Sequence, residues 1–370
     1  MNYDCVIIGG GAIGLSIAYE MARRGATIAV IERSRLGRES SWAGAGVIPP
    51  APTIDNVDPF DQLKALSHAL FPDWSEALLN ESGIDNGFWK CGAVYVGRSD
   101  GEVGAIEGLK YQWADEGIKF DVLDNDQLLQ MIPAIAGEIA AVRSAIYLPD
   151  EYQICNPYHI KALIGACRLR NVDFFEEADI QEFHTQNLIL KGLETTAGPF
   201  YADHFVAASG AWTGSLLKQL DIQISMVPVR GQMLAFKLKE QILFTVINDS
   251  SRYLVPRKDG WILAGSTMEH AGFDKSLTPE AQKSLFDFAN RLIPQLNATN
   301  LLNRWAGLRP GTFDGFPYLG RCPTIENLFV ATGHFRWGLT CSTGTANIIA
   351  DLVEGKPSAI DLTHFRVSRG

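Results

Sequence analysis

Three glycines near the start of the chain, Gly9, Gly11 and Gly14, have the spacing of a phosphate-binding turn. They follow the apolar run 5–8 and precede a helical pattern that continues to Arg24. In such a turn the first glycine permits a tight bend, the second lets the backbone approach a pyrophosphate, and the third permits close packing of helix on sheet. The free N–H groups at the start of the helix face the phosphates. The chemistry predicted for this segment is the binding of a dinucleotide.

Glu32 ends the second apolar run, residues 27–31. A carboxylate at this place accepts the hydroxyl groups of an adenosine ribose and would repel a 2′-phosphate, so the predicted ligand is FAD or NAD and not NADP. The alternative is an ordinary turn between a strand and a helix, because glycine-rich turns are common. The flanking strand, the apolar helix face and the terminal acid all agree with the dinucleotide site and favour it.

Later segments favour FAD over NAD. Residues 34–46 are rich in hydroxyl-bearing and small side chains, as suits a second backbone pass beside a bulky cofactor, although a flexible loop is the alternative. The apolar run 205–208 leads into a small-residue turn that resembles the second glycine-bearing turn of FAD proteins. If the ligand is FAD, the turn 338–340, at the start of a predicted C-terminal helix, is placed to stabilise negative charge on the reduced flavin.

Arg309 is the candidate for binding a substrate. It lies between Gly307 and Pro310 on a constrained turn, and its planar guanidinium suits bidentate binding of a carboxylate. A surface ion pair is the alternative for such an arginine. Tyr253, on a strand that carries Pro256, can donate its hydroxyl to the same carboxylate, and a cross-strand aromatic with a solvated hydroxyl is the alternative. The residue types alone leave these alternatives open, and a site that orients an amino acid depends on the wider motif in which Arg309 lies.

The composition is that of an ordinary globular protein. The 370 residues are 46% hydrophobic and 20% charged, which suits two domains with cores and argues against disorder. A net charge of −10 argues against a nucleic-acid or anionic-membrane surface. The six cysteines lack the spacing of a metal site or a disulfide framework. No room for a signal peptide precedes the first strand, and no apolar stretch approaches the length of a membrane span. We expect a soluble cytoplasmic protein without metal, nucleic-acid or membrane partners.

The order of the predicted elements indicates two interleaved domains, because no Pro/Gly/Ser-rich linker divides the chain. Helices are expected at 60–82, 103–117, 125–131, 156–167 and 279–292, and strands at 224–229, 232–238, 252–256 and 261–264. The predicted fold class is α/β. A Rossmann-like FAD-binding domain of residues 1–85, 144–220 and 304–370 is interleaved with an antiparallel-sheet substrate-binding domain of residues 86–143 and 221–303.

Several segments together resemble the glycine oxidase branch of the D-amino-acid oxidase family of FAD-dependent oxidoreductases. They are the first glycine turn with Glu32 and residues 40–46, 253–257, 264–268, 305–312 and 333–338, and the resemblance covers essentially the whole chain. The sequence GLRPGT at 307–312, followed by Gly-His-Phe-Arg at 333–336, is its most specific part. The resemblance implies FAD as the cofactor, a small amino acid as the substrate, and molecular oxygen or another electron acceptor. A homo-oligomer is also expected.

The activity implied by this resemblance is oxidative deamination of glycine or a similar small amine by hydride transfer to flavin. The products would be the imine or glyoxylate, ammonia and hydrogen peroxide, and the implied pathway is thiamine thiazole synthesis. Alternatives are an oxidase or dehydrogenase acting on sarcosine, another N-substituted glycine or a D-amino acid. A non-catalytic or RNA-modifying flavoprotein and an NAD-dependent dehydrogenase are alternatives of other classes. Ser251 stands where related enzymes often carry a histidine, which leaves the preferred amine open.

The resemblance also assigns roles to individual residues. The implied catalytic residues are Arg309, Tyr253, Met268 and Arg336, with Met268 beside the α-carbon of the substrate. Core filling is the alternative for Met268, and a structural salt bridge is the alternative for Arg336. The implied cofactor-binding residues are Gly9, Gly11, Ala12, Ile13, Gly14, Glu32, Arg33, Ser40, Ser41, Ala45, Gly46, Ile180, Ala208, Gly210, Trp212, Gly333, His334, Arg336, Gly338, Leu339 and Thr340.

Overall fold

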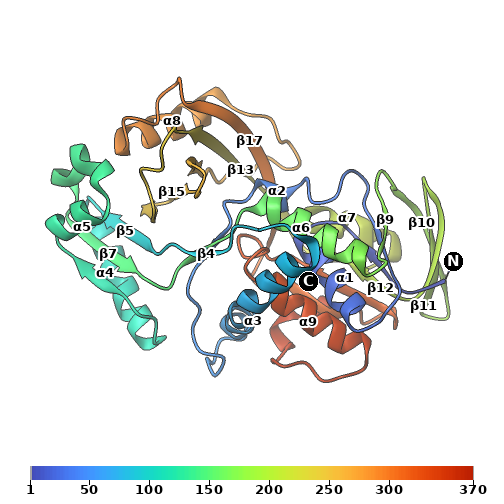
Figure 1. The fold of residues 1–370 in the computed structure, drawn as a ribbon. Coiled ribbons are helices and arrows are strands. Elements are labelled where there is room, and N and C mark those ends of the chain that lie inside the picture. The colour runs from blue at the N-terminus through green and yellow to red at the C-terminus, as the bar shows by residue number, and fades with distance from the viewer. Residues whose placement is uncertain (1, 370) are drawn as a thin grey trace.

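The computed structural model describes residues 2–369, which form two parts, each built on its own eight-stranded sheet (Figure 1). The parallel core of the first sheet runs in the order β9 (Asp173–Phe175), β2 (Ile28–Ile31), β1 (Asn2–Ile8), β12 (Gly198–Ala207) and β19 (Leu328–Thr332). Antiparallel strands complete it: β11 (Ile189–Thr195) on β12, β10 (Ile180–Gln186) on β11, and β18 (Tyr318–Arg321) on β19. Strands β2 and β19 are buried along their whole length, as expected where both faces of a parallel sheet are covered.

One face of this sheet is covered by four helices, α1 (Ala12–Arg23), α3 (Pro59–Ser82), α6 (Asn156–Leu169) and α9 (Ser342–Val353). Local sequence sets the ends of α3: Asp58 accepts a hydrogen bond from the N–H of Phe60 at 2.7 Å, Pro59 occupies the first helical position, and Gly83 ends the helix with φ of 71°. On the opposite face, a second hydrophobic cluster joins residues of β1, β2, β12 and β19 with residues of β10 and β11 from the same sheet and with the short helix α7 (Thr213–Leu217).

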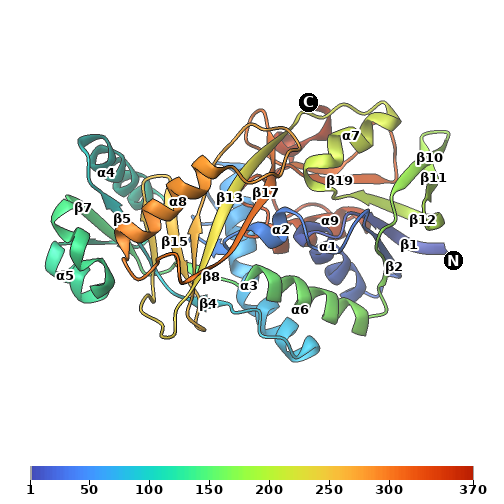
Figure 2. The same cartoon turned by 90° about the horizontal axis from the view of Figure 1, so that it is seen from above.

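The second sheet has the order β17 (Leu301–Thr312), β13 (Met226–Lys237), β16 (Trp261–Gly265), β15 (Arg252–Pro256), β14 (Val246–Asp249), β5 (Ala93–Gly97), β7 (Ser144–Leu148) and β6 (Asp121–Leu123). Only β14 and β5 pair in parallel within this order. Helices α8 (Pro279–Leu292) and α5 (Asn125–Met131) cover one face, and α4 (Asp100–Asp115) packs on β5 and β7. Figure 2 shows β13 and β17 running side by side toward the first part.

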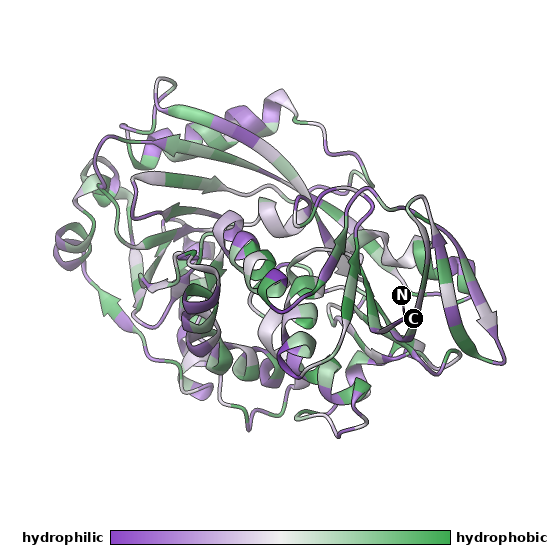
Figure 3. Ribbon diagram, turned by 45° about the vertical axis from the view of Figure 1, so that its right-hand side comes forward, coloured by the Kyte–Doolittle hydropathy of each residue, from purple (hydrophilic) through white to green (hydrophobic). Residues whose placement is uncertain are grey.

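A three-stranded sheet of β3 (Val47–Ile48), β8 (Tyr152–Gln153) and β4 (Trp89–Lys90) joins chain segments that connect the two parts. The remaining short elements are α2 (Ser40–Ala43) and the 3-10 helices Pro133–Ala141, Gly210–Trp212, Lys218–Leu220, Thr363–Phe365 and Val367–Arg369. Figure 3 shows hydrophobic residues concentrated on the strands of both sheets, which places a separate core in each part.

The helices predicted at 125–131 and 279–292 are confirmed with the same bounds. The strands predicted at 224–229 and 232–238 form one continuous strand, β13, that passes through Gly231. Pairing places β7 and β17 in the second sheet, although the predicted segments 144–220 and 304–370 put β7 and most of β17 in the FAD-binding domain. The composition of a strand shows that it is buried but not which sheet it joins. With these two strands reassigned, the division into two domains stays a prediction.

Candidate functional site

A cavity of about 560 Å³ is lined by residues of both parts. The first part contributes the ends of β1 and β2, the start of α1 and segment 39–49, and the second part contributes residues of β13, β15 and β17. Of the residues singled out from the sequence, all line this cavity except Gly14 and Met268.

The glycine turn after β1 has the close packing that its spacing predicts. Gly9 has φ of 115°, and a Cβ atom there would overlap the carbonyl group of Ala208. A Cβ atom at Gly14 would overlap the carbonyl oxygen of Gly9, so Gly14 brings α1 against the turn and does not itself line the cavity. The N–H of Ala12 donates to Ser41 Oγ at 2.8 Å, which joins the turn to segment 39–49.

Glu32 lies directly beside the glycine turn. Its carboxylate accepts hydrogen bonds from the N–H of Gly10 and the N–H of Ser34, each at 2.9 Å. The guanidinium of the next residue, Arg33, lies 3.8 Å from the ring centroid of Trp212. All these side chains line the same end of the cavity, where Glu32 is half-buried and can accept further hydrogen bonds.

The predicted second backbone pass, residues 34–46, is held by side chains to which the sequence analysis assigns no role in the site. Asn156 donates from Nδ2 to the carbonyl oxygen of Ser41 at 2.7 Å, while its Oδ1 is buried without a partner among residues 2–369. The buried guanidinium of Arg257 donates to the carbonyl oxygen of Ala45 at 2.7 Å. A Cβ atom at Gly46 would overlap the carbonyl oxygen of Ile154. The pass is therefore fixed by α6 and by the residues that directly follow β8 and β15.

The C-terminal side of the cavity is the turn between β19 and α9. His334 is buried with its Nε2 at 3.0 Å from Thr345 Oγ1, and burial lowers the pKa of His334 to about 3, so its ring is neutral at neutral pH. The N–H groups of Gly338, Leu339 and Thr340 make no hydrogen bond within the described chain. Helix α9 begins slightly later than expected, at Ser342. This turn offers free donors to the cavity.

Arg309, on β17, is half-buried, and its guanidinium is held by the segment after β16. Nη1 donates to the carbonyl oxygen of Thr267 at 3.1 Å, and Nη2 donates to Ser266 Oγ at 2.7 Å. Burial lowers the pKa of Arg309, and nearby Arg336 lowers it further, whereas Tyr253 acts in the opposite direction. The Tyr253 hydroxyl lies 3.5 Å from the sulfur of Met233, a weak acceptor.

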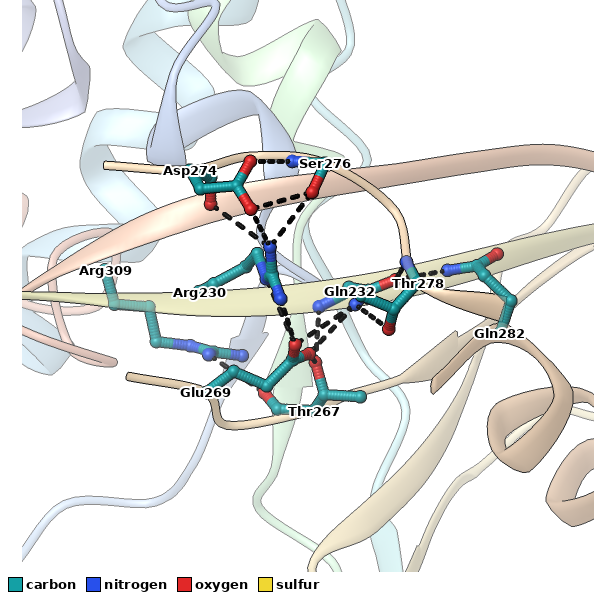
Figure 4. A network of polar contacts seen from close by, with 9 residues as sticks. All are labelled: Arg230, Gln232, Thr267, Glu269, Asp274, Ser276, Thr278, Gln282 and Arg309. Carbon is teal, nitrogen blue, oxygen red and sulfur yellow. Dashed lines mark hydrogen bonds and ion pairs between the residues drawn. The ribbon is translucent and has the colours of Figure 1, made fainter. Parts of the chain in front are cut away.

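A polar network behind Arg309 fixes the residues that hold it (Figure 4). Arg230 donates from Nη2 to Glu269 at 2.6 Å and from Nη1 to Asp274 at 2.7 Å. Glu269 also accepts the hydroxyl of Thr267, and the Thr267 oxygen in turn accepts the N–H of Gln232 at 2.8 Å. The carbonyl oxygen that faces Arg309 is therefore anchored through β13. The site roles of Arg230, Gln232, Glu269 and Asp274 were not predicted from the sequence, whereas Thr267 lies in segment 264–268, which carries part of the family resemblance.

Met268 is not placed where the resemblance implies. Its side chain is 59% exposed and lies outside the cavity lining, with its sulfur 3.7 Å from Nη2 of Arg336. Arg336 does line the cavity, and its side chain is exposed. Two further lining residues, Tyr95 on β5 and Asn248 on β14, were missed. Successive side chains of a strand point to opposite faces of the sheet, so the alternation along β5 and β14 is the sequence signal that could have identified these two residues.

Comparison with known proteins shows the family. The model of the DAO family of FAD-dependent oxidoreductases matches residues 4–352. The chain belongs to this family. It is 33% identical to a glycine oxidase of Pseudomonas aeruginosa, over 98% of this chain and 97% of that protein. It is 30% identical to a D-amino acid dehydrogenase of Vibrio atlanticus, over 99% of each. The crystal structure of glycine oxidase from Geobacillus kaustophilus matches with a TM-score of 0.93 and 31% identity, over 100% of this chain and 99% of that one.

The cofactor of this DAO-family enzyme is FAD, and the cavity fits it. The glycine turn leaves room for a pyrophosphate at the start of α1, Glu32 has free acceptor capacity, and residues 338–340 present unpaired N–H groups. Among residues 2–369, no cluster of His, Cys, Asp or Glu has the arrangement of a metal site. No helix in the same range has the length and apolar character needed to span a membrane.

Proposed function

We propose that this DAO-family protein oxidises glycine or a similarly small amino acid to the imine, which water hydrolyses to glyoxylate and ammonia when glycine is the substrate. The observation that carries the proposal is the position of Arg309. Its guanidinium lies in the same cavity as Glu32 and the glycine turn, and Ser266 and Thr267 hold it in one orientation. A carboxylate bound by this guanidinium is fixed relative to the rest of the cavity.

The residues of the chain have three tasks in this reaction. Arg309 binds the substrate carboxylate through two N–H groups, and the Tyr253 hydroxyl adds a third donor. The guanidinium groups of Arg309 and Arg336 disfavour the ammonium form of the bound substrate, because like charges lower its pKa. The neutral amine has the electron pair that becomes the C=N bond as the α-hydrogen leaves. When bound, FAD supplies the two-electron acceptor for that hydride.

Further roles are proposed for the residues around the cofactor. Gly9, Gly11 and the start of α1 would contact the pyrophosphate, and Glu32 would accept the ribose hydroxyls. The free N–H groups of residues 338–340 would stabilise negative charge near the pyrimidine ring of the reduced flavin. Gly14 acts by packing α1 on the turn, and Met268, being exposed, would at most line the entrance.

The proposal also covers the cellular compartment, the oligomeric state, the pathway and the electron acceptor. All six cysteines are free, which suits the reducing cytoplasm. Action in the cytoplasm as a homo-oligomer without nucleic-acid partners, and a role in thiamine thiazole synthesis, are further parts of the proposal. Whether the reduced enzyme passes its electrons to oxygen, forming hydrogen peroxide, or to another acceptor is an outcome of the experiment.

The test has two steps. Purified protein is first mixed anaerobically with glycine, sarcosine, D-alanine or D-proline while the absorbance of oxidised flavin near 450 nm is followed; reduction by the small substrates supports the proposal. Oxygen is then admitted and hydrogen peroxide is measured, which separates an oxidase from a dehydrogenase. Flavin that stays oxidised with every amine would exclude the proposed function.

A further inference from the structure

The face of the second sheet toward the cavity carries a continuous row of side chains. Strand register pairs Tyr95 with Asn248, Asn248 with Tyr253, Tyr253 with Gly265, and Gly265 with Met233. Paired residues of neighbouring strands share a face, so the row lies on one wall. Its four side chains all line the cavity.

Asn248, in the middle of this row, has an amide with no assigned use. Its side chain makes no hydrogen bond to any residue from 2 to 369, and its Nδ2 atom is buried. A buried amide donor left without a partner is unfavourable, which is why such groups in folded proteins are nearly always paired. Asn248 lines the cavity from the strand next to Tyr253, the proposed contact of the substrate carboxylate.

The neighbour of Asn248 on its other side is held by a buried acid. The hydroxyl of Tyr95 lies 3.3 Å from Oε2 of Glu151, whose side chain is fully buried. Burial raises the pKa of Glu151 to about 8, so this carboxyl group is neutral at neutral pH. The Tyr95 ring is thereby fixed beside Asn248, and no negative charge is added behind this wall.

The charges of the cavity are also unequal between its two ends. The acidic residues among its lining, Glu32, Glu39 and Asp179, all belong to the first part. The substrate end has the guanidinium groups of Arg309 and Arg336. The single carboxylate of glycine balances one of them, so the site tolerates a second carboxylate or another electron-rich oxygen.

We propose that Asn248, with Tyr95 beside it, forms a second polar subsite that binds an oxygen acceptor on the substrate, beyond its α-carboxylate. The acceptor is a carboxylate or carboxamide oxygen carried on the amine nitrogen or on the side chain, two or three bonds from the reacting carbon. This inference rests on the proposed function, since it names the class of small amino acid that the site prefers.

The experiment compares substrates of matched size with and without the acceptor. N-Carboxymethylglycine, N-(carbamoylmethyl)glycine and N-propylglycine are assayed with the FAD-loaded enzyme, and kcat/KM is expected to be at least about 10-fold higher for the two acceptor-bearing amines. In Asn248→Leu that ratio is expected to fall to near one. Asn248→Asp keeps the size but repels an anion, so it should lower kcat/KM for the carboxylate substrate more than for the carboxamide.

A binding measurement supplies a second readout. Diglycolate has two carboxylates and no oxidisable amine, and it is titrated against the flavin absorbance spectrum of the wild type, Asn248→Leu and the control Asn303→Leu. Asn303 is exposed on β17 and lies outside the cavity lining. We expect diglycolate affinity to fall about 10-fold in Asn248→Leu and to stay unchanged in the control. Asn248→Ser replaces the leucine variant if the latter loses its FAD.

The outcomes separate this inference from the function on which it rests. A preference ratio near one in the wild type, or a ratio that the Asn248 variants leave unchanged, overturns the subsite even when glycine reduces the flavin. Flavin that no amine reduces overturns the proposed function, while the diglycolate titration still reports on the subsite. Diglycolate affinity that does not depend on Asn248 would also overturn the subsite.

Discussion

Gly231 lies directly against the guanidinium of Arg309, where a Cβ atom would overlap Nη1, Nη2 and Cζ. The two residues belong to the paired strands β13 and β17, and Gly231 stands opposite Gly307 in that pairing. Gly231 thus makes room for the planar group, which also contacts the Ser266 side chain, whereas a Cβ atom at Gly307 would overlap Ala43. The Arg309 geometry depends on this empty space as much as on its hydrogen bonds.

Gly231→Ala should therefore displace Arg309 without unfolding the protein, because the overlapping atoms are the far end of a flexible side chain. We expect kcat/KM for glycine to fall roughly 10–100-fold with FAD content unchanged. Steady-state kinetics and flavin absorbance measure both quantities. Gly108→Ala in α4, where a Cβ atom meets nothing within 4 Å, is the matched control. Unaltered kinetics in Gly231→Ala would mean that the position of Arg309 does not matter.

Removing the guanidinium itself gives a larger loss. Arg309→Ala should cost roughly 2–5 kcal/mol in kcat/KM, and Arg309→Lys should be intermediate because it keeps the charge without the planar fork. Acetate and glycolate should compete with substrate in the wild type and lose that ability in Arg309→Ala. Exposed Arg304→Ala on the same strand is the control. Near-normal kinetics of Arg309→Ala with flavin bound would show that Arg309 does not bind the carboxylate, and Arg336 would become the next candidate for that role.

Glu269 gives a test of the network behind Arg309. Glu269→Gln puts an amide where Arg230, Gln232 and Thr267 all donate, so Thr267 should lose its fixed position. We expect KM for glycine to rise roughly 10-fold, with a smaller change in kcat, because Arg309 binds ground state and transition state alike. Exposed Glu240→Gln should leave both constants unchanged. Unchanged KM and kcat in Glu269→Gln would show that the network does not position Arg309.

Glu32→Ala should weaken FAD binding by roughly 1.5–3 kcal/mol, because charge-assisted hydrogen bonds to the ribose are lost. The apoprotein is titrated with FAD and followed by the quenching of flavin fluorescence. Glu182→Ala, an exposed change on β10, controls for the loss of charge. Equal FAD affinity in Glu32→Ala and the wild type would assign Glu32 only to the backbone of Gly10 and Ser34.

The buried Glu151 predicts how stability depends on pH. Burial raises its pKa in the folded protein to about 8, so the folded state binds the proton more tightly than the unfolded chain does. The stability that this proton contributes is complete below the unfolded pKa of about 4.3 and declines as the pH rises toward 8. Between pH 5 and pH 8, Glu151→Gln should gain roughly 3 kcal/mol relative to the wild type. Urea unfolding at these pH values measures the difference; an equal difference at both would place an ionised group at this position.

The parts of the site that lie within one short segment of sequence could be predicted from that segment. The glycine turn and Glu32 were recognised because one short βαβ segment holds every part of them, and the structure lines the cavity with that segment. Arg309 was recognised because its flanking glycine and proline are adjacent in sequence. The sheet membership of β7 and β17 was not predictable, because strand partners lie far apart in the chain and a buried apolar strand fits either sheet.

The residues that support the site were missed for the same reason. Arg230 meets Glu269 across 39 positions of sequence, and Asn156 reaches Ser41 across 115. Each has an unremarkable sequence context, and only the folded register gives it a role. Met268 shows the reverse: its segment resembles the family, yet its side chain is turned to solvent. A motif fixes a position in the backbone more firmly than it fixes the direction of a side chain.

The order of strands in the first sheet means that this sheet can be completed only after most of the chain has been synthesised. Strand β1 pairs with β12, and β12 pairs with β19, so the wall that begins the cavity is complete only when residues near 330 are available. The turn 338–340 that closes it is made later still. During synthesis at the ribosome the glycine turn emerges first, and the segments that complete its site emerge near the end of the chain. A chain that stops before this turn lacks part of the cavity lining, so we expect it to bind FAD more weakly than the full chain.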